Sequence, residues 1–507
     1  MAITKVTGAL LGNYTGGSAD DTVVIGDGAG DAITTGVHNT FVGDNSGTAI
    51  TTGGENVAIG ADTLVAQTTA SYNTAVGYNS GTANTTGSQN TFVGRYAGTA
   101  NTTGADNVVV GSGAFVTNTT GADNVAVGKG ALNANTTADD NTAVGHDAVL
   151  ANTTGADNVA IGSTVLDENT TGSANTAVGS TALNSNTTAS NNTAVGYGSQ
   201  ANNTTGTDNV SVGSHSLDAN TTGSDNTAIG DNALGANTTA GYNTAVGSGA
   251  LAGATTGANN VAMGYLAGND ITTGEYNVAL GIYALDAATT SSDNTAVGAH
   301  ALGGATGASN TALGKNAGNN ITSGSQNVCI GNGPNPSAAD SQEQIVIGTT
   351  TTPGAGDNTV RFGSDTGTVY IALDNSTTSW TKSSDERLKE NIETSTAGLS
   401  FINDLRPVIF DCKKKKDIPE DMKSIYSHVE DDAPCVGKGK KVHGFIAQEV
   451  EDVIVNHPEI VEGNSITDVD AQGVHSLAEG ALMPMMVKAV QELSAEVEEL
   501  KKQLENK

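Results

Sequence analysis

An asparagine recurs every 17 residues from Asn39 to Asn294, and the series resumes after one 16-residue step at Asn310 and Asn327. A glycine follows each anchor asparagine four residues later, from Gly43 to Gly331. The unit reads approximately N-T-A-V-G-x-x-A-L-x-x-N-T-T-G-x-x. A fixed period of this length is typical of a solenoid, because one such unit cannot bury its apolar face alone and must stack on its neighbours.

The repeat predicts a mainly β solenoid or β-roll over residues 22–331. We expect two short strands and two turns per unit, since N-T-A-V alternates polar and apolar residues at period two. Glycine suits the corners, where positive φ angles are needed. Asparagines at equivalent places can form stacked side-chain ladders, as they do in cross-β structures.

Each unit offers few apolar residues, and most of them are small. We therefore expect several chains to share one core, with their alanine and valine faces turned inward. The repeat resembles the head repeats of trimeric autotransporter adhesins and the repetitive shafts of phage tail fibres. The resemblance covers roughly residues 20–331, and it implies a homotrimer.

The charge is strongly acidic and unevenly distributed. The formal net charge is −32, and residues 1–383 hold only six lysines and arginines. This argues against nucleic-acid binding, which needs cationic surface to displace counterions. No apolar run approaches the ~20 residues that span a bilayer, so we expect no membrane insertion. Cys329, Cys412 and Cys435 lack a metal-ligand spacing, and we expect free thiols and neither a cofactor nor a metal.

Two other classes of solenoid share features with the repeat. The Asn-Thr-Thr-Gly segments are reminiscent of ice-binding solenoids, but neighbouring residues of a strand point to opposite faces. The segments therefore do not place a double threonine row on one face. Calcium-binding β-rolls carry a nonapeptide G-G-x-G-x-D pattern, which the sequence lacks.

The period ends after residue 331. Residues 332–383 contain Gly-Pro-Asn-Pro and three segments with strand character at 344–348, 358–363 and 368–373. We expect a β module there that caps the open end of the solenoid, because such ends need covering. Residues 1–21 precede the first repeat, and we expect them to form an attachment segment.

The composition changes at Ser383–Ile392, and three later segments resemble one family. They are Ser384-Asp-Glu-Arg-Leu-Lys-Glu-Asn-Ile392, Leu405-Arg-Pro-Val-Ile-Phe410 and His443-Gly-Phe-Ile-Ala-Gln-Glu-Val450. In this order they resemble the C-terminal intramolecular chaperone domain of endosialidase-type phage tailspikes, a self-cleaving domain. The resemblance covers about residues 383–507 and implies a small α+β domain over 384–507.

The resemblance also implies which residues act. Ser384 would be the nucleophile and Lys389 its base, and the bond between Ser383 and Ser384 would be cut. Asp385, Asn391 and His443 are candidate supporting residues. A lysine acts as a base only when neutral, so burial or nearby cations must lower the pKa of Lys389 from ~10.4.

The local pattern leaves another interpretation open. Ser384 before acidic residues is a good helix N-cap, so the same stretch could be an ordinary helix start with surface ion pairs. Residues five apart on one helix lie about 140° apart around its axis. Ser384 must therefore lie off the helix, or the pair must form between chains. His443 could equally be a packed turn histidine.

The chain ends in an apolar heptad pattern. Its members are three and four residues apart, and they are Met483, Met486, Val490, Leu493, Val497, Leu500 and Leu504. This spacing is typical of a short coiled coil over residues 483–504. The alternative is one amphipathic helix packed on its own domain.

Together these patterns predict a homotrimeric tail-fibre or tailspike-like virion protein, made in the host cytoplasm and extracellular when mature. The expected partners are further copies of the chain, a tail or baseplate protein at the N-terminus, and a host cell-surface receptor, of which a glycan is one candidate. The only expected enzymatic activity is single-turnover self-cleavage. The alternative is an uncleaved bacterial trimeric surface adhesin. A polysaccharide-degrading tailspike is less well supported, since the shaft lacks the carboxylate pair of glycosidases.

Overall fold

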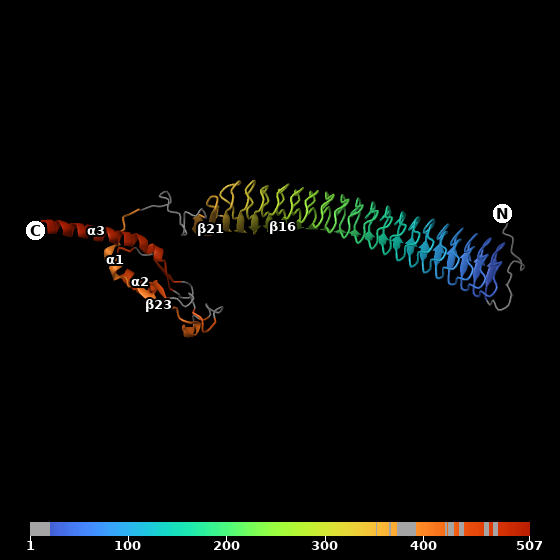
Figure 1. Ribbon diagram of the computed structural model, residues 1–507, viewed down its shortest axis with the longest axis horizontal. Helices are drawn as coiled ribbons and strands as arrows, with labels where there is room; N and C mark the ends of the chain where they lie inside the picture. Colours follow the sequence, from blue (N-terminus) through green and yellow to red (C-terminus); the bar gives the residue numbers. More distant parts are fainter. Residues whose placement is uncertain are drawn as a thin grey trace, which may run out of the picture. The chain divides into compact units, whose positions relative to one another are not determined.

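A computed structural model describes residues 21–350, 352–364, 367–372, 392–420, 423, 430–434, 441–460, 466–469 and 475–506. The chain divides into two compact units, residues 1–383 and residues 384–507. The first is a long stack of coils, drawn from blue to yellow in Figure 1, and the second holds the helices.

The stack is built on a single 22-stranded sheet. Strands β1 to β21 pair in sequence order and in parallel, each displaced by one repeat, as in Val108↔Val125. The strands are β1 Val23–Ile25, β2 Thr40–Val42, β3 Val57–Ile59, β4 Thr74–Val76, β5 Thr91–Val93, β6 Val108–Val110, β7 Val125–Val127, β8 Thr142–Val144, β9 Val159–Ile161, β10 Thr176–Val178, β11 Thr193–Val195, β12 Val210–Val212, β13 Thr227–Ile229, β14 Thr244–Val246, β15 Val261–Met263, β16 Val278–Leu280, β17 Thr295–Val297, β18 Thr311–Leu313, β19 Val328–Asn332, β20 Ile345–Thr349, β21 Thr359–Ser364 and β22 Gly367–Ala372. The predicted parallel β-solenoid is confirmed.

Each coil encloses its own core. Positions within a coil are counted from the anchor asparagine as position 0. Position 2, the strand centre, is buried, and so are the small residue at position 7 and the larger one at position 8, as at Ala126, Ala131 and Leu132. Leu132 lies in the left-handed region with φ 49°, and this turns its side chain under the sheet.

Two ladders of asparagines run through the core, as the repeat predicts. Each anchor Oδ1 accepts the backbone N–H of the next anchor; for example, Asn158 N–H donates to Asn141 Oδ1 at 3.0 Å. A second ladder at position 11 extends from Asn84 to Asn237, where Asn152 Nδ2 donates to Asn135 Oδ1 at 2.9 Å. Buried amides are stable only when paired in this way, so the ladders align successive coils.

Glycine at position 4 is required by close backbone approach. Gly77 has φ 130°, and a Cβ there would lie 2.6 Å from the carbonyl oxygen of Gly94 in the next coil. No L-residue fits without shifting the neighbouring backbone. The glycines therefore set the closeness of coil stacking.

Two details of the prediction were wrong. Each coil has one strand rather than two, of three residues in β1 to β18. Left-handed residues at positions 6, 8 and 16 break any second extended segment, as at Asn45, Leu64 and Asp106. Alanine and valine do not share an inward face either. Within the strands the centre is buried, whereas positions 1 and 3 point outward, as in Val108 and Val110.

The sheet continues beyond residue 331. Strands β20 and β21 extend the parallel stack, and β22 then pairs antiparallel with β21. The three strands expected in this region are present. They prolong the solenoid, and the final antiparallel strand covers the edge of β21.

One coil is a residue shorter, yet its ladder is intact. Asn310 N–H donates to Asn294 Oδ1 at 3.0 Å across the 16-residue step. The missing residue is the outward second threonine of the corner, because Thr306 is followed directly by Gly307. The deletion therefore affects only the surface of the coil.

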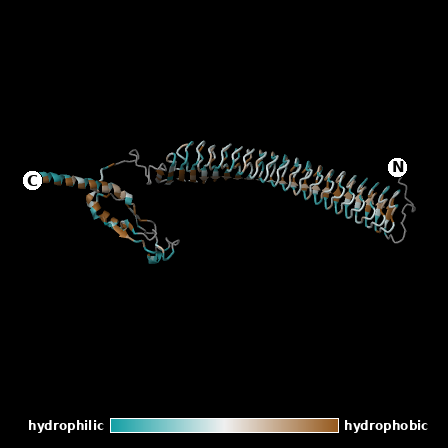
Figure 2. Ribbon diagram, in the orientation of Figure 1, coloured by the Kyte–Doolittle hydropathy of each residue, from teal (hydrophilic) through white to brown (hydrophobic). Residues whose placement is uncertain are grey.

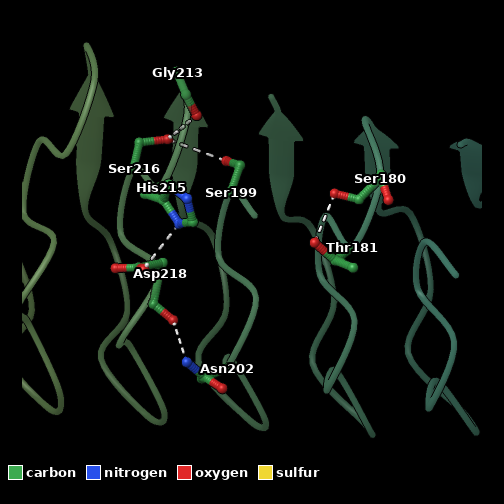
Figure 3. Close-up of polar contacts among 8 residues, drawn as sticks. All are labelled: Ser180, Thr181, Ser199, Asn202, Gly213, His215, Ser216 and Asp218. Atoms are coloured by element: carbon green, nitrogen blue, oxygen red, sulfur yellow. Dashed lines mark hydrogen bonds and ion pairs between the residues drawn. The ribbon is translucent and has the colours of Figure 1, made fainter. Parts of the chain in front are cut away.

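A polar cluster interrupts the apolar core where β11 meets β12. The core residues fall into one group from Ala29 to Ala194 and another from Leu217 to Val346. Between them the hydroxyls of Ser199 and Ser216 lie 3.1 Å apart, and Gln200 Nε2 donates to Ser211 Oγ at 3.0 Å. Figure 3 shows the contact between Ser199 and Ser216 beneath the strands.

The second unit is a small α+β domain. Its elements are α1 Leu399–Asp404, β23 Val408–Phe410, η2 Lys415–Asp417, β24 Val442–Gly444, α2 Ala447–Val455, β25 Thr467–Val469, β26 His475–Leu477, η4 Glu479–Leu482 and α3 Met483–Glu505. Strands β23 and β24 form one antiparallel pair, and β25 and β26 form another. The core gathers around Phe401, Leu405, Val450 and Leu482.

Candidate functional site

The residues predicted to cut the chain are Ser383, Ser384 and Lys389, with Asp385 and Asn391 as supporting residues. All five lie outside the described residues, so their geometry stays a prediction. His443 is the predicted site residue that the structure places.

His443 lies in the middle of β24, opposite Ile409 of β23. Its side chain is exposed, so it is not a packed turn histidine. It lines a hollow of about 430 Å³ together with Pro407, Phe445 and Glu479. The hollow brings together an imidazole, a carboxylate and apolar side chains.

The fold brings together two of the three family-like segments. Strand β23, from the segment 405–410, pairs with β24, from the segment 443–450. Arg406 then donates from Nε to Glu449 Oε2 at 2.9 Å. This hydrogen bond and ion pair raises the pKa of Arg406 and lowers that of Glu449. Because both side chains are solvent-exposed, the pair orients the segments more than it stabilises them.

His457 connects α1 to the segment after α2. Its side chain is 7% exposed, its Nε2 lies 2.8 Å from Asp404 Oδ2, and its Nδ1 lies 2.7 Å from Glu459 Oε1. The ring also meets Phe401 edge-on, with 5.3 Å between centroids. The hydrogen bonds to Glu459 and Asp404 raise the pKa of His457 above its ordinary value. Sequence reasoning missed this residue; the only signal was a His-Pro-Glu run after an apolar helix.

Helix α3 leaves its heptad residues exposed. Val490, Leu493 and Leu504 are at least half exposed, whereas Ala489 on another face is buried. The helix contacts α1 through Glu492, whose Oε2 accepts the N–H of Leu399 at 2.7 Å. Figure 2 shows the helix banded in hydrophobic and hydrophilic residues. Met486, near the start of the seam, lines a small cavity with Ile402 and Leu405. From Val490 to Leu504 each seam residue is at least 44% exposed within the described part of its own unit.

The ranges that the structure describes contain two free cysteines and no cluster of metal ligands. No group of three or more His, Cys, Asp or Glu is placed there to hold a metal ion. Cys329 and Cys412 are free thiols, and burial raises the pKa of Cys329 to about 12, which makes it unreactive. Among the same described residues, no helix has the length and apolarity to cross a membrane.

Comparison with known proteins finds a family that matches part of the C-terminal unit. Residues 384–461 match the family described as chaperone of endosialidase. This confirms the predicted resemblance, and the matched segment begins at Ser384, the first residue of the second compact unit. Searches of curated proteins and of solved structures return no match.

Proposed function

We propose that the chain is a phage tail-fibre or tailspike-like protein whose C-terminal unit assembles the shaft and then releases itself. The observation that carries this proposal is a chaperone of endosialidase segment directly behind a long solenoid. Residues 1–21 would attach to the virion, and the solenoid would form the shaft and contact the host receptor.

Chains with such a repeat need a part outside the repeat to align them with one another. Its coils carry the same ladders at the same positions, so two chains shifted by a whole coil meet almost the same surface. Strand register is well specified only where the pattern differs between alternatives. A C-terminal clamp that joins the chains first would fix their alignment before the shafts associate.

Two uncharged surfaces support assembly from copies of this chain. One is the heptad seam of α3. The other consists of the outer rows, meaning the side chains at positions 1 and 3 of strands β1–β20. Every outer-row residue is Thr, Val, Ile, Leu or Met, on a chain with a net charge of −32. Acidic surfaces elsewhere would repel one another, so copies would meet along this uncharged face, as a homotrimer.

The proposed release is an acyl transfer followed by hydrolysis. Ser384 Oγ, deprotonated by neutral Lys389, attacks the carbonyl carbon of Ser383. The C–N bond breaks, an ester to Ser384 forms, and the freed amine of Ser384 takes up the proton. Water then hydrolyses the ester, which restores the hydroxyl and leaves a carboxylate on Ser383. Ser-Lys pairs are a known nucleophile and base arrangement.

Mass spectrometry of the purified protein tests the release. Wild type should give a fragment that begins at Ser384, whereas Ser384→Ala and Lys389→Ala should stay at full length. Ser383→Ala is the matched control, because it keeps both reacting side chains and should still be cut. A folded wild-type chain that stays intact would refute cleavage and favour an uncleaved surface adhesin.

A further inference from the structure

The shaft buries its phenylalanines and leaves its tyrosines at the surface. Within residues 21–350 the phenylalanines are buried, and they are Phe41, Phe92 and Phe115. The tyrosines of the same range are all exposed or half-exposed, and they are Tyr72, Tyr78, Tyr96, Tyr197, Tyr242, Tyr265, Tyr276 and Tyr283. The core therefore does not need these tyrosines.

Several of these tyrosines meet an aromatic ring of the next coil at the corner that follows the strand, at positions 5 and 6. Tyr78 packs on Tyr96 with centroids 5.6 Å apart, and Tyr197 packs on His215 at 5.2 Å. The largest cluster spans three successive coils. Its rings are those of Tyr265, Tyr283 and His300, with centroid separations of 5.6 and 5.3 Å.

The second of these two corner positions lies in the left-handed region of backbone conformation. Tyr283 and His300 occupy position 6 with φ 53° and 55°. Some other coils place glycine there, at Gly113, Gly130 and Gly249, and others place a non-glycine residue in the same left-handed region, as at Asn79 and Thr181. An L-residue in the left-handed region costs roughly 1–2 kcal/mol. The corner therefore accepts glycine as well as larger residues, and glycine can replace a ring there without straining the backbone.

A carboxylate lies near the rings, since Asp286 interacts electrostatically with Tyr283 and His300. Figure 3 shows the equivalent corner at His215. There His215 Nδ1 lies 3.3 Å from Asp218 Oδ2. In the largest cluster Asp286 takes the place of Asp218, and burial together with the nearby Asp270 raises its pKa. Asp270 also lines a shallow groove of about 440 Å³ with Asn269, Thr272 and Thr289.

The charge around the cluster limits what can bind. Residues 130–314 contain no lysine or arginine, and Lys315 lies at the same corner of the coil next to that of His300. Asp270 and Asp286 therefore outnumber the one lysine near the cluster, which disfavours an anionic ligand. The ring of Tyr265 stands at 86° to that of Tyr283, whereas His300 is nearly parallel to it at 16°. The three rings therefore form an angled apolar surface bordered by hydrogen-bond acceptors. Apolar C–H faces edged with hydroxyl or amino groups complement such a surface.

We propose that Tyr265, Tyr283 and His300 bind a saccharide whose contacting sugar is neutral or carries an amino group. The C–H face of the sugar packs on the rings, and Asp270 and Asp286 accept its hydroxyl or ammonium hydrogens. This inference rests on the proposed role in host attachment, and it assigns that role a site and a ligand class.

The test is an array of defined neutral, amino and acidic bacterial oligosaccharides, probed with the purified full-length protein. The site variant is Tyr265→Ala, Tyr283→Gly and His300→Gly combined. Glycine suits position 6, so this variant should fold at least as well as wild type. The matched control is Tyr242→Gly, which removes an exposed tyrosine with φ 62° outside the aromatic clusters.

Wild type and Tyr242→Gly should bind at least one neutral or amino oligosaccharide, and the site variant should bind it at least tenfold more weakly. Equal binding by wild type and site variant overturns this site while attachment stands. Binding to acidic oligosaccharides alone overturns the ligand class. If wild type binds nothing on the array, the saccharide proposal fails, whereas cleavage and assembly are judged separately by mass spectrometry.

Discussion

At the scale of single residues, His457 is the group whose protonation most clearly stabilises the C-terminal unit. Its folded pKa lies above the unfolded value of ~6.5 because Glu459 and Asp404 accept its hydrogens. Its contribution is therefore complete below pH ~6.5 and is lost as pH rises through the folded pKa. His457 conversely lowers the pKa of Glu459; that contribution is present above the unfolded pKa of ~4.3 and is lost as pH falls.

The C-terminal unit should accordingly be most stable between about pH 5 and 6.5. Thermal unfolding followed by the helical circular dichroism signal should show a lower midpoint at pH 9 than at pH 6, by roughly a few degrees. His457→Gln should flatten this dependence. The matched variant His443→Gln removes an exposed histidine and should leave the profile unchanged. If the unfolding midpoint of His457→Gln depends on pH as steeply as that of wild type, this explanation is contradicted.

At the scale of elements, the polar cluster between β11 and β12 is the main departure from the repeat. Ser199, Gln200, Ser211 and Ser216 stand where other coils have Ala182, Leu183, Ala194 and Ala233. The four side chains bond to one another, but Gln200 Oε1 is buried without a partner. A coil pair with this network fits only its own neighbour, so the cluster distinguishes one stacking step from the rest.

Removing one member of the cluster should destabilise the shaft, whereas replacing all four should stabilise it. Ser211→Ala deprives Gln200 Nε2 of an acceptor and should destabilise the shaft by about 1–3 kcal/mol. Replacing the set with the repeat residues, as Ser199→Ala, Gln200→Leu, Ser211→Ala and Ser216→Ala, should raise the unfolding midpoint, since no buried polar group is left unpaired. Chemical denaturation followed by the β-sheet signal separates the two. A quadruple variant as unstable as the single one would refute the explanation.

The elements also show what the sequence could predict. The period, the glycine corners and the asparagine ladders follow directly from residue spacing. The face that is buried does not, because strict alternation identifies two faces without saying which lies inside. Nor does the sequence reveal that Leu132 adopts φ 49°, and this geometry is what replaces the expected second strand. The contact of Arg406 with Glu449 joins segments 43 residues apart, so their spacing gave no indication of it.

At the scale of the whole molecule, the outer rows form an uncharged face on a strongly acidic chain. A charge placed on these rows would have to be desolvated in any interface between copies, which is costly. Assembly should therefore be sensitive to charge on this face and tolerant of charge at the threonine corners.

Sedimentation of freshly expressed protein checks this expectation. Wild type should sediment as a trimer, and Val110→Lys with Val212→Lys should give smaller species. The matched control, Thr103→Lys with Thr205→Lys, adds the same charge at exposed corner positions and should remain trimeric. A monomeric wild type, or a trimeric valine variant, would exclude the outer rows as the interface.

The shortened coil at Asn294 has a broader consequence. Because the missing threonine lay outside every ladder, the corner between Thr306 and Gly307 can change length while the coils on either side keep their pairing. Equivalent corners recur along the shaft, so the protein has a series of permissive points where added segments would project outward. The sequence can therefore diversify by insertions at the corners while the solenoid that carries them stays unchanged.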